Sequence, residues 1–207
     1  VSWNALISGY VHCGLHNEAF ECFQTMANEG VSPDRVTYIS ILKACGIVGS
    51  LDLGQDIHDR IRKQGLLQKD IVLGNVLVDM YAKCGAFEKA KGVFEQLPIR
   101  NVVSWTALID GYVQHGLAEE ALKLFQFMKD QDDISPDSIT FMCLLKACGS
   151  VGAIEKGKQV HDEIVNRGLL EKKIELCNAL VDMYAKCGVL AKAQEVLEEL
   201  PIQNIVS

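Results

Sequence analysis

Apolar residues along this chain recur three and four positions apart, the spacing that places side chains on one face of an α-helix. The pattern comes in pairs of short segments separated by a few residues. In the first pair the apolar positions are Trp3, Leu6, Ile7 and Tyr10, followed by Ala19, Phe20, Phe23 and Met26. Each pair predicts two amphipathic helices packed as a hairpin. The aromatic and methionine stripes are interpreted as the core between the helices.

The hairpin pattern repeats along the chain. The run Asn75–Gly85 returns as Asn178–Gly188, 103 residues later, with a single substitution. The run Val1–Tyr10 returns as Val103–Tyr112 with two. Self-similarity of this kind indicates a stack of small units that bury a shared core. Any function is therefore expected to be one event repeated along the chain.

Glycine and proline mark the predicted helix ends, because glycine accepts the left-handed backbone that follows many helices. Glycines are expected to end first helices at Gly14, Gly85, Gly116 and Gly188, and second helices at Gly30, Gly65 and Gly168. Prolines fall in the connections after second helices, at Pro33, Pro98, Pro136 and Pro201. The first helices are predicted over 1–13, 36–47, 71–84, 102–115, 139–148 and 174–187.

These signals divide the chain into six units of unequal length in a fixed order of long, longer and short. Their bounds are 1–34, 35–70, 71–101, 102–137, 138–173 and 174–204, and residues 205–207 restart the pattern. A tetratricopeptide array would instead keep about 34 residues throughout. The predicted fold is all-α: six helix-turn-helix hairpins stacked into a right-handed superhelical solenoid.

Composition narrows the class further. The chain has 207 residues, 49% of them hydrophobic, which is enough for a substantial core. It has no apolar run near the ~18–20 residues that cross a bilayer, and no membrane partner is expected. It shows no signal or transit peptide, and the repeat is already under way at Val1. The chain is therefore expected to be part of a longer protein.

Cysteine and histidine give no pattern of a metal or catalytic site. The eight cysteines include no Cys-x-x-Cys pair, and five directly precede a glycine, so they are predicted to be free thiols packed near helix ends. The five histidines lack the His-Glu-x-x-His and zinc-deaminase patterns. His58 and His161 recur with the repeat and are expected to face outward. No enzyme activity and no cofactor are predicted for this chain, and a deaminase domain would lie outside it.

Four short motifs carry a family resemblance: Val1–Ile7, Ser32–Asp34, Leu42–Cys45 and Asp79–Gly85. With these motifs and its unit lengths, the chain resembles the pentatricopeptide repeat (PPR) family over its whole length. The order of lengths is similar to the plant PLS-type subclass, so the units are assigned as P, L, S, P, L and S. The resemblance implies a single-stranded RNA-binding array of an organellar RNA-editing or processing factor, in a mitochondrion or chloroplast.

The resemblance also implies which side chains contact bases. Proteins of this family read one base per repeat through two or three side chains. The first reader lies one turn into each first helix, and the second is the last residue of the unit. Polar pairs are Asn4/Asp34, Asn75/Asn101, Thr106/Asp137 and Asn178/Asn204, whereas the L units carry Ile39/Asp70 and Met142/Lys173. Asn and Asp also cap helices and turns, but four polar pairs in register favour base reading.

Stacking and phosphate contacts follow from the same resemblance. Apolar side chains are expected to sandwich the bases, namely Val1, Val36, Val72, Val103 and Ile139, and the sixth unit departs with Glu175. Phosphate contacts are expected from Lys83 and Lys186. The net charge of −7 opposes general affinity for nucleic acid. The first helices nevertheless balance four lysines against four acidic residues, so modest binding with a shallow salt dependence is expected.

The reader pairs imply a base sequence. A carboxylate as second reader suits U or G, whose pairing edges carry an imino N–H, and an amide suits C or A. With the first readers as in the family, the expected site is 5′-U-N-C-G-N-C-3′. The alternative is a protein-binding helical scaffold for a small organelle editing cofactor protein or a peptide. Uncapped apolar ends are also expected to favour self-association.

Overall fold

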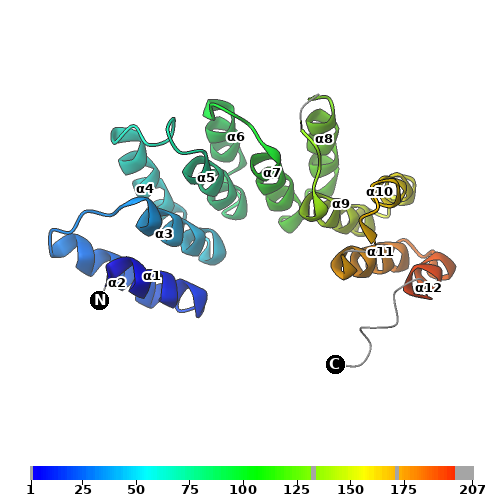
Figure 1. The fold of residues 1–207 in the computed structure, drawn as a ribbon, viewed down its shortest axis with the longest axis horizontal. Helices are drawn as coiled ribbons and strands as arrows, with labels where there is room; N and C mark the ends of the chain where they lie inside the picture. Colours follow the sequence, from blue (N-terminus) through cyan, green and yellow to red (C-terminus); the bar gives the residue numbers. More distant parts are fainter. Residues whose placement is uncertain (1, 132–133, 171–172, 199–207) are drawn as a thin grey trace. The chain divides into compact units, whose positions relative to one another are not determined.

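The computed structural model describes residues 2–131, 134–170 and 173–198, and in these ranges it contains twelve α-helices and no strand (Figure 1). The helices are α1 (Trp3–His12), α2 (His16–Asn28), α3 (Arg35–Val48), α4 (Leu51–Lys63), α5 (Ile71–Lys83), α6 (Phe87–Gln96), α7 (Val102–Gln114), α8 (Ala118–Lys129), α9 (Ser138–Val151), α10 (Ile154–Asn166), α11 (Ile174–Lys186) and α12 (Leu190–Glu198). None of them is long and apolar enough to cross a membrane.

Odd-numbered helices are the first helices of the hairpins and even-numbered ones are the second. Five first helices begin at residues 35, 71, 102, 138 and 174, where the sequence division starts a new unit. The chain divides into two compact units, Val1–Gly111 and Tyr112–Ser207. In the first, α3 packs against α1, α4 and α5; in the second, α9 packs against α8, α10 and α11. Each of these first helices therefore contacts its own second helix and the next first helix.

Fully buried aromatic side chains fill these helix contacts. Tyr38 and Tyr81 lie in the first compact unit, and Phe141 and Tyr184 in the second, each almost fully buried. Burying one large apolar side chain stabilises a fold by about 1.5–3 kcal/mol. The indole of Trp105 meets the ring of Phe94 edge-on, with 4.7 Å between centroids, which joins α7 to α6. Of the apolar positions named for the first hairpin, Ile7, Ala19, Phe23 and Met26 are buried as predicted. Leu6 is exposed, and Trp3, Tyr10 and Phe20 are half-buried, so the core prediction holds only in part there.

All seven glycines predicted to end helices have left-handed backbone. Two more, Gly49 and Gly152, end α3 and α9, so these helices reach Val48 and Val151 instead of residues 47 and 148. The prediction that the Cys-Gly pairs at Cys45 and Cys148 lie at helix ends is therefore wrong: both cysteines are fully buried inside a helix.

The physical reason is a close approach between neighbouring first helices. A Cβ atom on Gly46 would lie 3.3 Å from the Cα of Met80 on α5, and one on Gly149 would lie 3.3 Å from the Cα of Met183 on α11. A side chain at either glycine would push the two backbones apart. In α5 the same Cys-Gly pair does end the helix, because Cys84 is its C-cap residue.

His58 and His161 point inward, contrary to the prediction that they face outward. Their Nδ1 atoms lie 3.0 and 2.9 Å from the hydroxyls of Tyr81 and Tyr184 on the next first helix. Both tyrosines are almost fully buried, so their hydroxyls need a hydrogen-bond partner inside the protein. Burial lowers the pKa of His58, which favours its neutral form.

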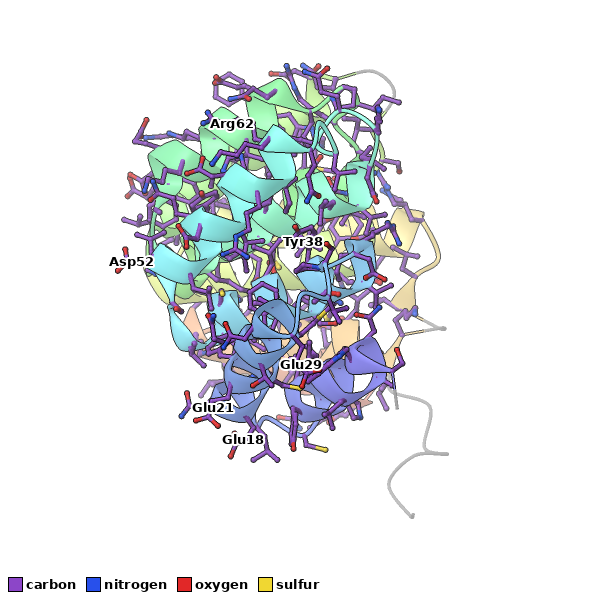
Figure 2. All side chains as sticks on the ribbon, turned by 90° about the vertical axis from the view of Figure 1, so that its left-hand side faces the viewer. Glu18, Glu21, Glu29, Tyr38, Asp52 and Arg62 are labelled. Carbon is purple, nitrogen blue, oxygen red and sulfur yellow. The ribbon has the colours of Figure 1, made fainter. Side chains whose placement is uncertain are left out.

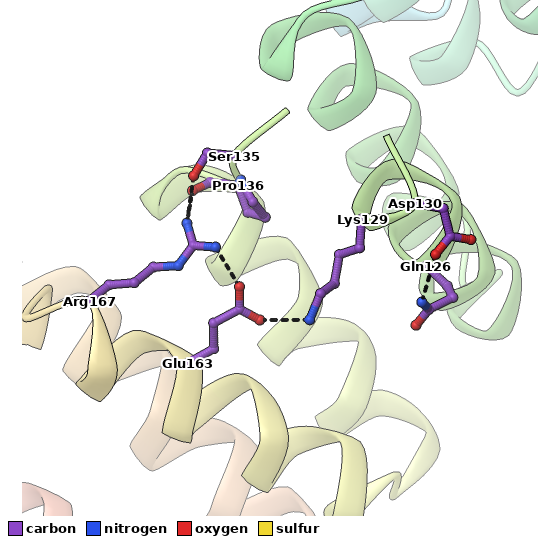
Figure 3. A network of polar contacts seen from close by, with 7 residues as sticks. All are labelled: Gln126, Lys129, Asp130, Ser135, Pro136, Glu163 and Arg167. Atoms are coloured by element: carbon purple, nitrogen blue, oxygen red, sulfur yellow. Dashed lines mark hydrogen bonds and ion pairs between the residues drawn. The ribbon is translucent and has the colours of Figure 1, made fainter. Parts of the chain in front are cut away.

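A polar network joins the second helices of the second compact unit (Figure 3). Glu163 on α10 accepts hydrogen bonds from Lys129 on α8 at 3.2 Å and from Arg167 at 2.6 Å. Arg167 also donates to the hydroxyl of Ser135 at 2.7 Å and to the carbonyl of Pro136 at 3.1 Å, in the segment before α9. The participating side chains are partly exposed, so each pair contributes about 0.2–1 kcal/mol. The network therefore contributes little to the free energy of unfolding, but it restricts how α8, α10 and the segment before α9 are placed against one another.

Candidate nucleic-acid interface

The first predicted reader pair is brought together by the start of α3. Asn4 is the second residue of α1, and Asp34 is the residue that caps the N-terminus of α3. The Nδ2 of Asn4 donates to Oδ2 of Asp34 at 2.8 Å, and the other carboxylate oxygen accepts the backbone N–H of Thr37 at 3.0 Å. Capping and pairing therefore use different oxygens of the same carboxylate. The backbone hydrogen bond from Thr37, helped by those from Asn4 and the Thr37 hydroxyl, lowers the pKa of Asp34, which keeps it charged.

The third unit repeats this arrangement with two amides. The Nδ2 of Asn75 on α5 donates to Oδ1 of Asn101 at 3.2 Å, and that oxygen also accepts the backbone N–H of Ser104 at 3.1 Å. The Oδ1 of Asn75 is buried and has no hydrogen-bond partner. An unpaired buried acceptor is costly, and this oxygen is enclosed by the chain.

For the other two polar pairs, the structure describes three of the four residues. Asp137 caps α9 through the N–H of Thr140 at 2.9 Å, while Thr106 lies in the other compact unit. Asn178 is exposed on α11, and its partner Asn204 lies outside the described residues.

Two of the four predicted first readers are buried. The exposed fractions of Asn75 and Thr106 are 5% and 8%. Asn75 is hydrogen-bonded to Asn101, whose side chain also accepts the N–H of Ser104 in α7. Asn4 is half-buried, and Asn178 is exposed.

The first L unit has no hydrogen-bonded pair of readers, as its residues Ile39 and Asp70 predict. Asp70 caps α5 through the N–H groups of Val72 and Leu73, and it forms an ion pair with Arg35 at the start of α3. Burial alone raises the pKa of Asp70, but the hydrogen bond and charge of Arg35 and the two backbone hydrogen bonds lower it overall. The half-buried Ile39 offers no polar group to such a partner. No two-point polar contact is available in this unit.

Apolar side chains stand exposed beside the reader pairs. The exposed fractions are 45% for Val36, 43% for Val72, 53% for Val103 and 54% for Ile139. Each is the second residue of its unit, one or two positions after the helix cap. Exposed single apolar residues are common on protein surfaces, but four in register form a repeated surface suited to flat apolar rings. Val1 lies outside the described residues, and Glu175 is exposed at the equivalent position of the sixth unit.

The two lysines expected to contact phosphate are each held by an aspartate one turn earlier. Lys83 Nζ lies 2.8 Å from Asp79, and Lys186 Nζ lies 2.6 Å from Asp182. Their aliphatic stems lie close to the glycines inside the preceding first helices, Gly46 and Gly149. The charge of each lysine is therefore largely balanced within the chain, and a phosphate would have to share it.

Three residues beside the predicted readers are absent from the sequence prediction. They are fully buried hydroxyl residues, each three positions after a second reader that caps its helix, namely Thr37, Ser104 and Thr140. The signal was present, since Asp-x-x-Thr and Asn-x-x-Ser are capping patterns. Among the residues that the structure describes, no cluster of three His, Cys, Asp or Glu side chains could hold a metal ion, and the eight cysteines are free.

Paired helices repeated in register, with a row of paired polar side chains, define a helical-repeat protein of the all-α solenoid class. Comparison with protein families matches a PPR repeat family model to residues 1–46 and 100–150, and a PPR repeat model to residues 75–102, 139–169 and 175–205. The chain belongs to the PPR repeat family.

Relatives and solved structures agree with this. The chain is 37% identical over its whole length to putative pentatricopeptide repeat-containing protein At3g28640 of Arabidopsis thaliana, of which it spans 41%. It is 38% identical to the chloroplastic pentatricopeptide repeat-containing protein At4g25270 of the same plant, across all of this chain and 38% of that protein. The crystal structure of the maize pentatricopeptide repeat protein PPR10 matches 95% of the chain and 38% of PPR10, with a TM-score of 0.53 and 20% identity. That likeness concerns the fold.

Proposed function

We propose that this chain is a sequence-specific single-stranded RNA-binding array that reads one base per unit. The observation that carries the proposal is the pairing of readers, 2.8 Å apart in Asn4/Asp34 and 3.2 Å apart in Asn75/Asn101, beside the exposed valines Val36 and Val103. Two polar groups at a fixed separation match the donors and acceptors of a base edge, while flanking apolar side chains contact the base planes.

The comparisons support the same partner class. PPR10 was also crystallised in complex with an 18-nt psaJ RNA element, and that structure matches this chain with a TM-score of 0.51. Three of the relatives are chloroplastic pentatricopeptide repeat-containing proteins. We therefore place this chain in an organellar RNA-editing or processing factor of the PLS type, with the units P, L, S, P, L and S as assigned above. The mitochondrion and the chloroplast are both open.

The proposed site is 5′-U-N-C-G-N-C-3′, read from the first unit to the sixth. Asn4/Asp34 reads U, Thr106/Asp137 reads G, and the two Asn/Asn pairs, Asn75/Asn101 and Asn178/Asn204, read C. The L units leave their bases unspecified because Ile39 and Met142 have no group for a base edge.

Binding of the chain to labelled RNA, measured by fluorescence anisotropy, tests this proposal. The RNA carries U-A-C-G-A-C between adenosine flanks, and each position is varied in turn. Changing the first, third, fourth or sixth base should weaken binding by about 1–3 kcal/mol each, and changing the second or fifth should change little. Equal affinity for every single-base variant contradicts the proposal, and a protein-binding scaffold is then the better description.

A reader swap sharpens the test. Asp137→Asn replaces a carboxylate acceptor by an amide that both donates and accepts, so preference at the fourth base should move from G toward A. The other five positions should keep their preferences. A change at all positions, or at none, rules out one-base-per-unit reading.

A further inference from the structure

A buried hydroxyl connects the two readers of the first unit. Thr37 is fully buried, three positions after Asp34. Its Oγ1 donates to Oδ1 of Asn4 at 2.6 Å, lies 3.1 Å from Oδ1 of Asp34, and accepts the backbone N–H of Asp34 at 3.2 Å. One side chain of the following unit therefore contacts both members of a reader pair.

Proton counting shows what this contact fixes. A hydroxyl has one proton to donate, and the shorter distance assigns it to Asn4. The Nδ2 of Asn4 donates one proton to Asp34, so its carbonyl oxygen faces Thr37 and its NH2 group faces the carboxylate. The reverse orientation would place two acceptor oxygens together. The second N–H of Asn4 is left for a base, and its carbonyl oxygen is held toward Thr37.

The third unit has the same capping geometry without this link. Ser104 is fully buried three positions after Asn101, accepts the N–H of Asn101 at 2.9 Å and donates to its backbone carbonyl at 2.8 Å. No hydrogen bond joins Ser104 to Asn75, and the Oδ1 of Asn75 is the buried acceptor without a partner. Thr37 and Ser104 therefore share a capping role and differ in whether they contact the reader.

We propose that Thr37 is a positioning residue that sets the base preference of the first unit by holding the carbonyl oxygen of Asn4 toward itself. This rests on the proposed function and adds a third side chain to the reader pair. An amide held in this orientation presents its NH2 group on the side of Asp34, and a donor suits the carbonyl groups of U. The reverse orientation would present an acceptor, which suits the amino group of C. The hydroxyl of the next unit thus supports the second reader, Asp34, in favouring U over C.

Three variants of the 207-residue chain test the proposal. Thr37→Val removes the hydroxyl and keeps the shape, and Thr37→Ser keeps the hydroxyl. Ser104→Ala is the matched control, because it removes a capping hydroxyl that bonds the backbone of Asn101 and not the first reader Asn75. Affinities are measured for RNA carrying U or C at the first position and, for the control, at the third. Unfolding midpoints are measured alongside.

The expected results separate positioning from stability. Thr37→Val should bring a preference for U over C of roughly tenfold to within about twofold, and Thr37→Ser should restore it. Ser104→Ala should lower the unfolding midpoint as Thr37→Val does, yet leave the preference for C at the third base unchanged. If Thr37→Val weakens binding of U and C equally, or Thr37→Ser fails to restore the preference, the hydroxyl only caps the helix and the proposal is overturned.

A readout without RNA distinguishes failure of this proposal from failure of RNA reading. The side-chain NH2 signals of Asn4, followed by ¹⁵N-correlated NMR, should shift in Thr37→Val and return in Thr37→Ser. Unchanged signals overturn the positioning role whatever the binding data show. Shifted signals in a chain that does not distinguish bases support the positioning of Asn4 and contradict the proposed function.

Discussion

At the residue scale, two of the predicted second readers each make two kinds of contact with one side chain. Asp34 caps α3 and binds Asn4, and Asn101 receives Ser104 and Asn75 on a single oxygen. The sequence offered capping and base reading as alternatives, and the geometry is compatible with both. A substitution at a second reader therefore changes helix stability as well as any base contact, since losing a cap costs about 1 kcal/mol.

A second residue-scale feature is the buried histidine His58, whose pKa is lowered mainly by burial, with Arg62 and Lys89 adding to the effect and Asp59 opposing it. The unfolded chain binds a proton near the ordinary pKa of about 6.5, whereas the folded chain binds it only at lower pH. The stability that depends on neutral His58 is therefore complete above pH 6.5 and is lost as the pH falls through the folded pKa.

His58→Gln should remove this part of the acid sensitivity, because an amide still reaches the hydroxyl of Tyr81 but does not titrate. Urea unfolding at pH 7.5 and pH 5 is the measurement, and His12→Gln, at an exposed position, is the control. The wild-type chain and the control should lose more stability between the two pH values than His58→Gln does. An identical loss in all three proteins would show that His58 does not couple protonation to folding.

At the element scale, the apolar spacing and the glycines were sufficient to predict the helices and their pairing. They failed where a neighbouring element decides the outcome. The same Cys-Gly pair ends α5 but lies inside α3, where Gly46 faces the backbone of another helix at 3.3 Å. His58 and Thr37 were missed for a similar reason: their partners, Tyr81 and Asn4, belong to other units.

Two glycines inside helices give opposite predictions for the same substitution. A Cβ on Gly92 in α6 meets nothing within 4 Å, so Gly92→Ala should stabilise the chain by about 0.5–1 kcal/mol through helix propensity. A Cβ on Gly111 in α7 would collide with the side chain and backbone of Ala82 in α5. Gly111→Ala should therefore destabilise by about 1–3 kcal/mol. Chemical unfolding of both variants checks the sign, and a stabilised Gly111→Ala would contradict the close packing of α5 and α7.

At the scale of the whole molecule, the net charge of −7 is distributed unevenly. Figure 2 shows Glu18 and Glu21 on α2 and Asp52 on α4 extending from second helices away from the ribbon. On the first helices, by contrast, the acidic residue Asp79 is paired with Lys83 at 2.8 Å. Total charge alone predicts weak attraction for a polyanion, whereas the pairing predicts that a single aspartate controls whether one lysine is available to phosphate.

Matched charge removals distinguish these two predictions. Asp79→Asn and Asp52→Asn each change the net charge by the same amount, but only the first releases a lysine from an ion pair. Asp79→Asn should strengthen binding of any single-stranded RNA by roughly fivefold, about 1 kcal/mol. The dependence of log affinity on log salt should also steepen by about 0.7, the value for one more phosphate contact on a single strand. Asp52→Asn should leave the salt dependence unchanged.

The measurement is fluorescence anisotropy on one RNA over a series of salt concentrations, with Asp79→Asn/Lys83→Gln as the double variant that should cancel the gain. Equal strengthening by Asp79→Asn and Asp52→Asn would show that long-range charge governs binding. No gain from Asp79→Asn would show that Lys83 does not reach a phosphate. A gain seen only in Asp79→Asn, and lost when Lys83 is also replaced, would show that Lys83 contacts a phosphate once Asp79 no longer pairs with it. The chain would then bind RNA through a few lysines that its own carboxylates normally pair with, in spite of its acidic net charge.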